Sequence, residues 1–565
     1  MSQSDKVPRR IESVRRAAES GALDDAERLC RELIDGCPAG AAAHAEASVA
    51  LADILLRKGD AAAAFKAAHQ AASSGAPALD VLSVLAPAAI ATDARHEAGQ
   101  CMAQFQRLAP QQQARILMYW AERLEDLYMF AHAASVLQPL ADSPQADYDV
   151  LVFQAQLLLK AHRADAADAP LARAVRMDPE RVGAHLARVR QRIQLGRIED
   201  AVASALAVLA RDAASTPAAA MLSEIAPERL PEAAVAALEA TLDDADADLE
   251  SRAAAGLAMG RLLETRGDHE RAFDAFAAGN RALKRRAARR GHDYDHESVE
   301  ASVDALQKTF LDRIDATGDD GIGLAFIVGM PRSGTTLLDR ILAAHRQVVS
   351  VGEHAMMPAI AERAGTECGD SRQFEAGLAA SADRWRSQYL SSLPHKPGAD
   401  RMIVDKLPLN FWNVGLIARL FPRAVIIHAC RDPRDVGLSS FRLRFPDAFR
   451  YVNDFNDFAH YYAQHSRLMA HWLTVVPGSI LRIDYEQVVD SIEPSVRRLL
   501  DACGLPWDPA CLKFSENREA VYTLSMGQVR RELYRDATRR WRRYGDRLAD
   551  LERALEDSGV ELPPA

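Results

Sequence analysis

The chain has 565 residues, which is too long for a single hydrophobic core, so two or three domains are expected. Hydrophobic residues make up 48% and charged residues 26%, the balance of an ordinary globular protein. The net charge of −10 argues against nonspecific nucleic-acid binding by the whole protein, and the longest uncharged apolar runs are far too short for a membrane span.

The first sixteen residues are polar and charged, without the apolar segment of a signal peptide. The seven cysteines are odd in number and scattered, which predicts reduced thiols and a cytoplasmic location. The abundance of Ala and Arg indicates a bacterial source with a GC-rich genome. His460, His465 and His471 lie close in sequence, but their spacing does not put them on one helix face, so no metal site is expected.

Residues 10–285 predict an all-helical domain. They are rich in Ala, Leu, Arg and Asp, and a short turn followed by an Ala-studded amphipathic stretch recurs, with Arg163 and Arg197 standing 34 residues apart in two such turns. The pattern resembles degenerate tetratricopeptide repeats, which are helix pairs stacked into a solenoid. Such a solenoid implies a concave surface for a protein partner or a polypeptide acceptor. An irregular helical domain is the alternative.

Residues 286–320 are polar with only short apolar runs, and they predict the junction between domains. From residue 321 to 565 short β-branched runs alternate with amphipathic stretches. This alternation is typical of an α/β domain with a parallel sheet covered by helices. The runs expected to form strands are 325–328, 348–351, 401–404, 424–428 and 479–483.

The segment 326–338 predicts a buried strand, a turn with glycine, and a helix over 337–344. In this arrangement backbone N–H groups and the helix N-terminus converge on one anion. The spacing from Gly329 to Gly334 almost fits the nucleotide P-loop. Thr335, however, stands where that motif has Lys, and the cation has moved earlier, to Arg332.

Two candidate catalytic residues follow predicted strands. Glu353 can act as general base on an acceptor hydroxyl, and the alternative is a solvated loop carboxylate. Lys406 precedes Pro408, which stops any helix through this point, and it can reach the bridging oxygen of a bound anhydride. The alternative for Lys406 is a surface side chain paired with Asp405.

A third segment follows the run 424–428. A strand ends near Arg431, a helix begins near Pro433, and Ser439 lies about two turns into that helix. Arg431 and Ser439 can therefore converge on a second phosphate. The alternative is an Arg–Asp pair that caps the helix.

Together these motifs resemble one family. A Pro-Arg-Ser-Gly-Thr-Thr loop, a Gly-Glu pair, an Asp-Lys-x-Pro and an Arg-Asp-x-Arg block followed by Ser, in this order over about residues 322–545, resemble sulfotransferases that use 3′-phosphoadenosine 5′-phosphosulfate (PAPS). The pattern is similar in particular to tyrosylprotein sulfotransferases and their bacterial repeat-fused relatives. The resemblance implies a P-loop-like α/β domain that transfers a sulfuryl group to an acceptor hydroxyl, releases 3′-phosphoadenosine 5′-phosphate (PAP), and needs no metal.

The resemblance also assigns roles to residues. Glu353 matches the catalytic base, and Lys406 and Arg332 match cations that stabilise the developing charge. His354 stands where the animal enzymes have a second carboxylate, so the base is either Glu353 or His354 at this point. The residues implied in binding PAPS are Pro331, Arg332, Ser333, Gly334, Thr335 and Thr336 at the 5′-phosphosulfate, Arg431 and Ser439 at the 3′-phosphate, and Tyr485, Ser525, Gln528, Val529 and Arg540 around the nucleotide.

Three functions stay open on the sequence. The first is a sulfotransferase whose acceptor is a polypeptide, with a protein tyrosine as one candidate, or a glycan or small hydroxyl compound. The second is a P-loop phosphotransferase, against which the missing Lys argues, because that Lys serves the β- and γ-phosphates of a triphosphate. The third is a non-catalytic repeat scaffold, against which the intact Arg332, Glu353 and Lys406 argue.

Overall fold

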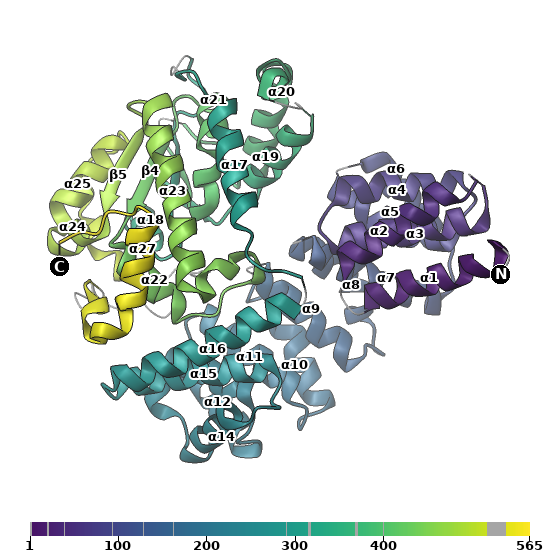
Figure 1. Cartoon of the computed structure of the whole chain (residues 1–565), viewed down its shortest axis with the longest axis horizontal. Helices are drawn as coiled ribbons and strands as arrows, with labels where there is room; N and C mark the ends of the chain where they lie inside the picture. The colour runs from purple at the N-terminus through teal and green to yellow at the C-terminus, as the bar shows by residue number, and fades with distance from the viewer. Residues whose placement is uncertain are drawn as a thin grey trace. The chain divides into compact units, whose positions relative to one another are not determined.

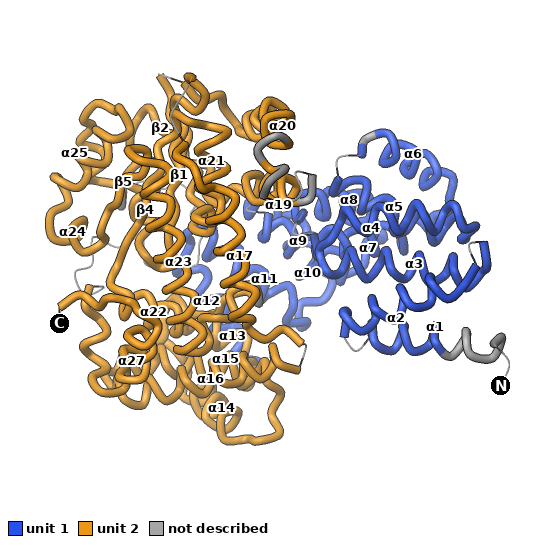
Figure 2. Tube along the Cα trace, turned by 45° about the horizontal axis from the view of Figure 1, so that its top comes forward, with its two compact units in different colours: residues 1–211 blue, residues 212–565 orange. Residues whose placement is uncertain are grey.

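The computed structural model describes residues 3–19, 22–38, 40–92, 94–127, 129–161, 163–289, 291–314, 318–367, 371–398, 400–516 and 538–564. The predicted nucleotide contacts Ser525, Gln528 and Val529 lie outside these described residues. The chain forms two compact units, Met1–Arg211 and Asp212–Ala565 (Figure 2). No helix among the described residues is long and apolar enough to cross a membrane.

The first unit consists of helices whose neighbours in sequence pack together. Its interior is rich in fully buried alanines such as Ala26, Ala64 and Ala133, which let helix backbones approach closely. The turn before α4 shows why the recurring sequence pattern works: Gly59 takes a φ of +88°, and Asp60 caps the helix by accepting from the N–H of Ala63 at 2.8 Å. The helices are α1 (Gln3–Glu19), α2 (Leu23–Gly36), α3 (Ala42–Arg57), α4 (Ala61–Ser73), α5 (Ala78–Ala91), α6 (Arg95–Phe105), α7 (Pro110–Asp126), α8 (Phe130–Asp142), α9 (Tyr148–Lys160), α10 (Asp168–Met177), α11 (Val182–Gln194) and α12 (Ile198–Arg211).

The second unit begins with further helices before the sheet. Within it, α15 and α16 cross at very short distance, since a Cβ on Gly256 would lie 2.6 Å from the backbone nitrogen of Gly279. The predicted boundary at 285 lies inside α16, the predicted junction 286–320 contains α17, and 321 lies shortly before β1 (Leu324–Gly329); as domain limits these boundaries stay a prediction. The helices are α13 (Thr216–Ile225), η1 (Pro227–Arg229), α14 (Glu232–Asp243), α15 (Leu249–Thr265), α16 (His269–Arg289) and α17 (His296–Thr309).

A five-stranded, all-parallel sheet follows, with strand order β2-β3-β1-β4-β5. It confirms the predicted fold class, a helical region followed by an α/β domain with a parallel sheet, and each predicted strand is present within two residues. The strands are β1 (Leu324–Gly329), β2 (Val348–Gly352), β3 (Met402–Asp405), β4 (Val425–Cys430) and β5 (Ile480–Asp484). The elements between and after them are α18 (Thr335–Ala343), α19 (Met356–Glu367), α20 (Ser371–Ser392), η2 (Pro408–Asn413), α21 (Val414–Leu420), α22 (Pro433–Phe441), η3 (Asp447–Asn453), α23 (Phe455–Val475), α24 (Tyr485–Asp490), α25 (Ile492–Ala502), η4 (Pro509–Glu516), η6 (Arg540–Leu548) and α27 (Ala549–Asp557).

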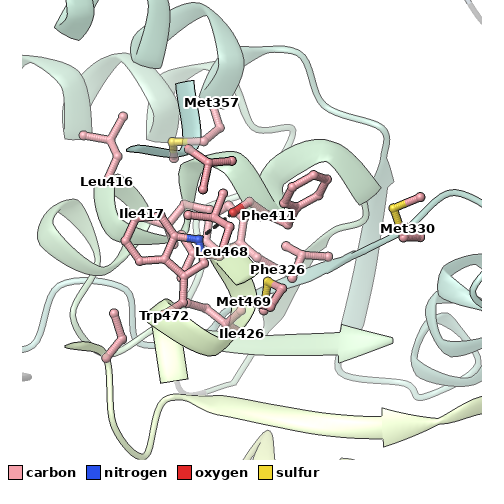
Figure 3. Close-up of a cluster of buried hydrophobic side chains, with 14 of the residues drawn as sticks. Phe326, Met330, Met357, Phe411, Leu416, Ile417, Ile426, Leu468, Met469 and Trp472 are labelled. Carbon is pink, nitrogen blue, oxygen red and sulfur yellow. Dashed lines mark hydrogen bonds between the residues drawn. The ribbon is translucent and has the colours of Figure 1, made fainter. Parts of the chain in front are cut away.

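Strand β1 is buried on both faces, because its side chains alternate between two hydrophobic cores. Phe326 points into the core shared with α21 and α23, where the indole of Trp472 donates to the carbonyl of Phe411 at 2.8 Å (Figure 3). Ile327 points into the opposite core, which α18 and α25 cover. In Figure 1 the strands β4 and β5 accordingly lie between α25 and α23. The doubly covered sheet fixes the position of every strand end.

Candidate active site

The carboxyl ends of all five strands lie at one edge of the sheet, because the strands are parallel. Each strand is followed there by a residue or loop that the sequence singled out. In spatial order these are Glu353 after β2, Lys406 after β3, the loop 330–334 after β1, Arg431 after β4 and Tyr485 after β5. The structure therefore brings motifs together that are spread over more than a hundred residues of sequence.

The loop after β1 is a tight backbone turn. Gly329 has a φ of +145°, and a Cβ there would lie 2.6 Å from the carbonyl oxygen of Ala429, so only glycine lets β1 and β4 approach. Arg332 takes a left-handed φ of +73°. Gly334, with a φ of +100°, is the N-cap of α18, which begins at Thr335, two residues before the predicted start.

This loop has unused hydrogen-bonding capacity. The hydroxyl of Ser333 is buried and has no hydrogen-bond partner among the residues that the structure describes. The first N–H groups of α18, including those of Thr335 and Thr336, have no intrahelical acceptor because they begin the helix. Both features suit a bound anion, which would accept from the hydroxyl and from the backbone N–H groups.

Predicted donor-site residues surround the loop. The Nε of Arg332 donates to the hydroxyl of Ser439 at 2.9 Å, and Nη1 of Arg431 donates to the carbonyl of Arg332 at 3.1 Å. The guanidinium of Arg431 lies 4.6 Å from the ring centre of Tyr485, and that ring also packs against the backbone of Gly334. Arg332, Arg431, Ser439 and Tyr485 therefore form one contact group with the loop.

The charge around Arg332 is dominated by other arginines. Burial, and after it the nearby guanidinium groups of Arg431, Arg442 and Arg540, together lower the pKa of Arg332 to about 9. Arg540 was predicted from the sequence, whereas Arg442 was missed; its signal was its position three residues after Ser439, directly after the end of α22. We call Arg332, Arg431, Arg442 and Arg540 the arginine cluster.

Two aspartates organise the elements beside the arginine cluster. Asp432 is the N-cap of α22 and pairs with Arg434 at 2.7 Å, so the Arg–Asp pair that caps the helix exists, and Arg431 itself lies 3.8 Å from Asp435. The buried Asp435 accepts from the backbone N–H groups of Arg539 at 2.7 Å and Trp541 at 3.1 Å. Asp435 thereby fixes the backbone on both sides of Arg540.

At the other end of the edge, Lys406 and Glu353 form an ion pair. The N–H of Lys406 donates to the carbonyl of Gly352 at 2.9 Å, and its Nζ donates to Oε1 of Glu353 at 2.6 Å. Lys406 is 1% exposed, whereas the Glu353 side chain is 39% exposed. The alternative of a surface Lys paired with Asp405 is wrong, because Asp405 is buried and instead accepts from the hydroxyl of Tyr389 at 2.8 Å.

His354 is engaged by its own neighbours. Its Nδ1 accepts from the N–H of Met356 at 3.1 Å, and its Nε2 lies 3.2 Å from the hydroxyl of Ser392. Burial lowers the pKa of His354, so the ring is neutral near pH 7. With Nδ1 acting as acceptor, the single ring proton lies on Nε2, which leaves His354 with no free basic nitrogen.

The parallel sheet and the loop at its carboxyl edge define a P-loop-like α/β domain. The loop is cationic and suited to bind a phosphate or a similar anion. Residues 325–509 match the profile of the Sulfotransferase family, so the chain carries a sulfotransferase-family domain. That match includes Arg332, Glu353, Lys406, Arg431 and Tyr485 and stops short of Arg540.

Several known proteins are similar to parts of this chain. An uncharacterized protein of Aquifex aeolicus is 30% identical over 343 residues, which cover 58% of this chain but only 44% of that protein. A putative protein-tyrosine sulfotransferase of Caenorhabditis briggsae is 27% identical over 227 residues, covering 39% of this chain and 80% of that protein. Protein-tyrosine sulfotransferase 1 of Danio rerio is 28% identical over 216 residues, which cover 37% of this chain and 60% of that protein.

Proposed function

We propose that the chain transfers a sulfuryl group from PAPS to an acceptor hydroxyl. The observation that carries this proposal is the division of the sheet edge, with the Glu353–Lys406 ion pair on one side of the loop and the arginine cluster on the other. PAPS has a matching division, since its sulfuryl group lies at the 5′ side and an extra phosphate lies at the 3′ side. The sulfotransferase-family match over residues 325–509 supports the same assignment.

The donor would lie along the loop. We assign the 5′-phosphosulfate to the loop and the start of α18, where the hydroxyl of Ser333 and the N–H groups of Thr335 and Thr336 are available. Arg431 and Ser439 would hold the 3′-phosphate. The remaining donor contacts in this proposal are Pro331, Arg332, Gly334, Tyr485 and Arg540, together with Ser525, Gln528 and Val529 beyond the described residues.

The transfer itself would be an in-line displacement. Glu353 takes the proton of the acceptor hydroxyl while the acceptor oxygen bonds to sulfur, and the bond between sulfur and the bridging oxygen breaks to release PAP. Lys406, buried beside Glu353, stabilises the negative charge that develops on the leaving phosphate. Glu353 is the better base than His354, because it is the group with free lone pairs and solvent access.

For the acceptor, we propose a tyrosine side chain of a polypeptide. Two of the similar proteins are named as protein-tyrosine sulfotransferases, and a helical repeat region is suited to holding an extended chain. The helical region from residue 10 to 285 would then bind the polypeptide whose tyrosine reacts.

Radiolabelled PAPS tests both parts of the proposal. The full chain is incubated with ³⁵S-labelled PAPS and a lysate of its own cells, with Glu353→Gln as the inactive control and labelled Mg·ATP in a parallel reaction. We expect sulfate label on a polypeptide, recovered as tyrosine sulfate. Label on a glycan or a small molecule would overturn the acceptor assignment, and phosphoryl transfer from Mg·ATP without sulfate transfer would overturn the proposed reaction.

A further inference from the structure

One carboxylate from the helical region reaches the arginine cluster. Glu264 lies near the end of α15, and its Oε2 accepts from Nη2 of Arg442. Its Oε1 accepts from the hydroxyl of Tyr544 at 2.8 Å and lies 3.9 Å from Nη1 of Arg540. The side chains of Glu264 and Arg442 are only 14% and 13% exposed, so their attraction is poorly screened by water.

The same helix pair also binds the backbone of α22. Nη2 of Arg261, on α15, donates to the carbonyl of Arg442 at 3.3 Å. Nδ2 of Asn280, on α16, donates to the carbonyl of Phe441 at 2.7 Å. These carbonyls lie at the C-terminal end of α22 and have no acceptor role within the helix, so α15 and α16 together cap the helix that carries Ser439 and ends just before Arg442.

Without a countercharge the arginine cluster is unfavourable in the empty site. The guanidinium groups of Arg431, Arg442 and Arg540 lower the pKa of Arg332 because like charges repel, and a long side chain such as Arg442 can relieve the repulsion by turning toward solvent. Glu264 opposes this movement because it binds Arg442 and lies against Arg540 from the side of α15. A preformed cluster binds an anion more tightly than a cluster that must first be assembled.

We infer that Glu264 is a positioning residue of the donor site, which holds Arg442 and Arg540 beside Arg332 and Arg431 before the second phosphate of the donor binds. The inference rests on the proposed function, since it needs a donor with a phosphate at the 3′ side. It makes the last helix pair before the sheet, α15 and α16, part of the donor site in addition to any role in holding the acceptor.

Three variants of Glu264 separate its reach from its charge. Glu264→Asp keeps the charge but is one methylene too short to contact both Arg442 and Tyr544. Glu264→Gln keeps the reach and loses the charge, and Glu264→Ala loses both. Tyr544→Phe leaves every charge in place and removes one hydrogen bond that orients the carboxylate. Asp274→Ala is the matched control, because it breaks the exposed ion pair of α16 with Arg547, outside the arginine cluster.

Calorimetric titration of each full-length variant with PAP and with AMP gives the preference for the 3′-phosphate. We expect the preference to fall about tenfold in Glu264→Asp, Glu264→Gln and Glu264→Ala, because each variant loses the reach or the charge that holds Arg442. The preference of Asp274→Ala should equal that of wild type, and AMP binding should change little throughout. If Glu264→Asp does not fold, a loss of about threefold in Tyr544→Phe takes its place as the expected result.

Other outcomes overturn the inference in distinguishable ways. A normal preference in Glu264→Asp, Glu264→Ala and Tyr544→Phe would mean that α15 only packs against α22. A weakened Glu264→Gln beside a normal Glu264→Asp would mean that charge acts without positioning. A wild type that binds PAP no better than AMP would overturn the proposed function itself, whatever the variants do.

Discussion

The two ends of the sheet's carboxyl edge carry charge in different ways. At β2 and β3 one cation and one anion, Lys406 and Glu353, are paired at 2.6 Å. At β1 and β4 several guanidinium groups gather, and burial together with their repulsion lowers the pKa of Arg332 to about 9. A site with one cation and one anion has little net attraction for an ion and suits local proton transfer. A site whose guanidinium groups outnumber its described carboxylates, Glu264 and Asp435, attracts a multiply charged anion. We therefore expect variants at the β2–β3 end to change the rate of sulfate transfer but not nucleotide affinity. Variants at the β1–β4 end should change nucleotide affinity.

The largest expected effect is at the paired end. Glu353→Gln should lower sulfate transfer by about 10²- to 10⁴-fold, because a positioned general base contributes about that much, and should leave PAP affinity within about threefold of wild type. Transfer of ³⁵S from PAPS and calorimetry with PAP measure the two quantities. His354→Gln is the matched control and should keep transfer within about tenfold. An equal loss in both variants would show that the two side chains act together.

At the cationic end, Arg431→Ala should weaken PAP binding by about 10- to 100-fold, because hydrogen bonds to charged groups contribute about 1.5–3 kcal/mol. The affinity of this variant for AMP, which lacks the 3′-phosphate, should fall by less than about threefold. Calorimetric titration of the same protein with both nucleotides makes the comparison. Arg482→Ala removes a solvent-exposed arginine of β5 and should change neither affinity. Equal losses for PAP and AMP in Arg431→Ala would contradict its assignment to the 3′-phosphate.

Gly334, between the two ends, tests the shape of the loop. An added Cβ would lie 2.6 Å from Cδ2 of Tyr485 on a backbone with a φ of +100°, so Gly334→Ala should lower the free energy of unfolding by about 1–3 kcal/mol and weaken PAP and AMP alike. Gly504→Ala is the control, because its φ is +65° but no atom lies near the added Cβ. The free energy of unfolding of Gly504→Ala should fall by about 1 kcal/mol, and this variant should bind both nucleotides normally. Chemical denaturation and calorimetry measure these effects, and normal nucleotide binding by Gly334→Ala would contradict the loop assignment.

The smallest expected effect is a pH dependence of stability beside the paired end. Burial raises the pKa of Asp405 to about 7, above its ordinary value of about 3.9, so the folded state holds this proton more tightly than the unfolded state. The resulting stability is present at about pH 4 and is lost as pH rises through about 7. The free energy of unfolding of Asp405→Asn, measured relative to wild type, should therefore rise by at least about 1 kcal/mol from pH 4.5 to pH 8.

Thermal unfolding at the two pH values measures this gain. The exposed Asp383→Asn should differ from wild type by the same amount at both values, since its carboxyl is 96% exposed. A constant difference between Asp405→Asn and wild type would contradict the raised pKa.

Most of the sheet could be predicted from the sequence, because a strand buried on both faces is an uninterrupted apolar run such as 324–328. The start of α18 was placed two residues late, since Thr335 and Thr336 are polar and do not register in an apolar period although both are buried. The burial of Lys406 was not visible either. Its partner Glu353 is 53 residues away, and only the pairing of β2 with β3 brings them together.

The contributions from the helices were the hardest to foresee. Glu264 lies 178 residues before Arg442, within a stretch whose composition indicates only repeated helices. No local pattern marks such a contact, because it depends on how α15 packs against the end of α22. Arg442 itself had a usable signal, its position three residues after Ser439, at the end of a helix that the sequence did predict.

The central claim is that the cationic end of the edge recognises a nucleotide with a second phosphate. Calorimetric titration of the full-length chain with PAP, AMP and Mg·ATP tests it most directly. We predict that PAP binds at least about tenfold more tightly than AMP without added metal, and that Mg·ATP binds more weakly than PAP. Equal affinities for PAP and AMP, or tighter binding of Mg·ATP, would contradict the account.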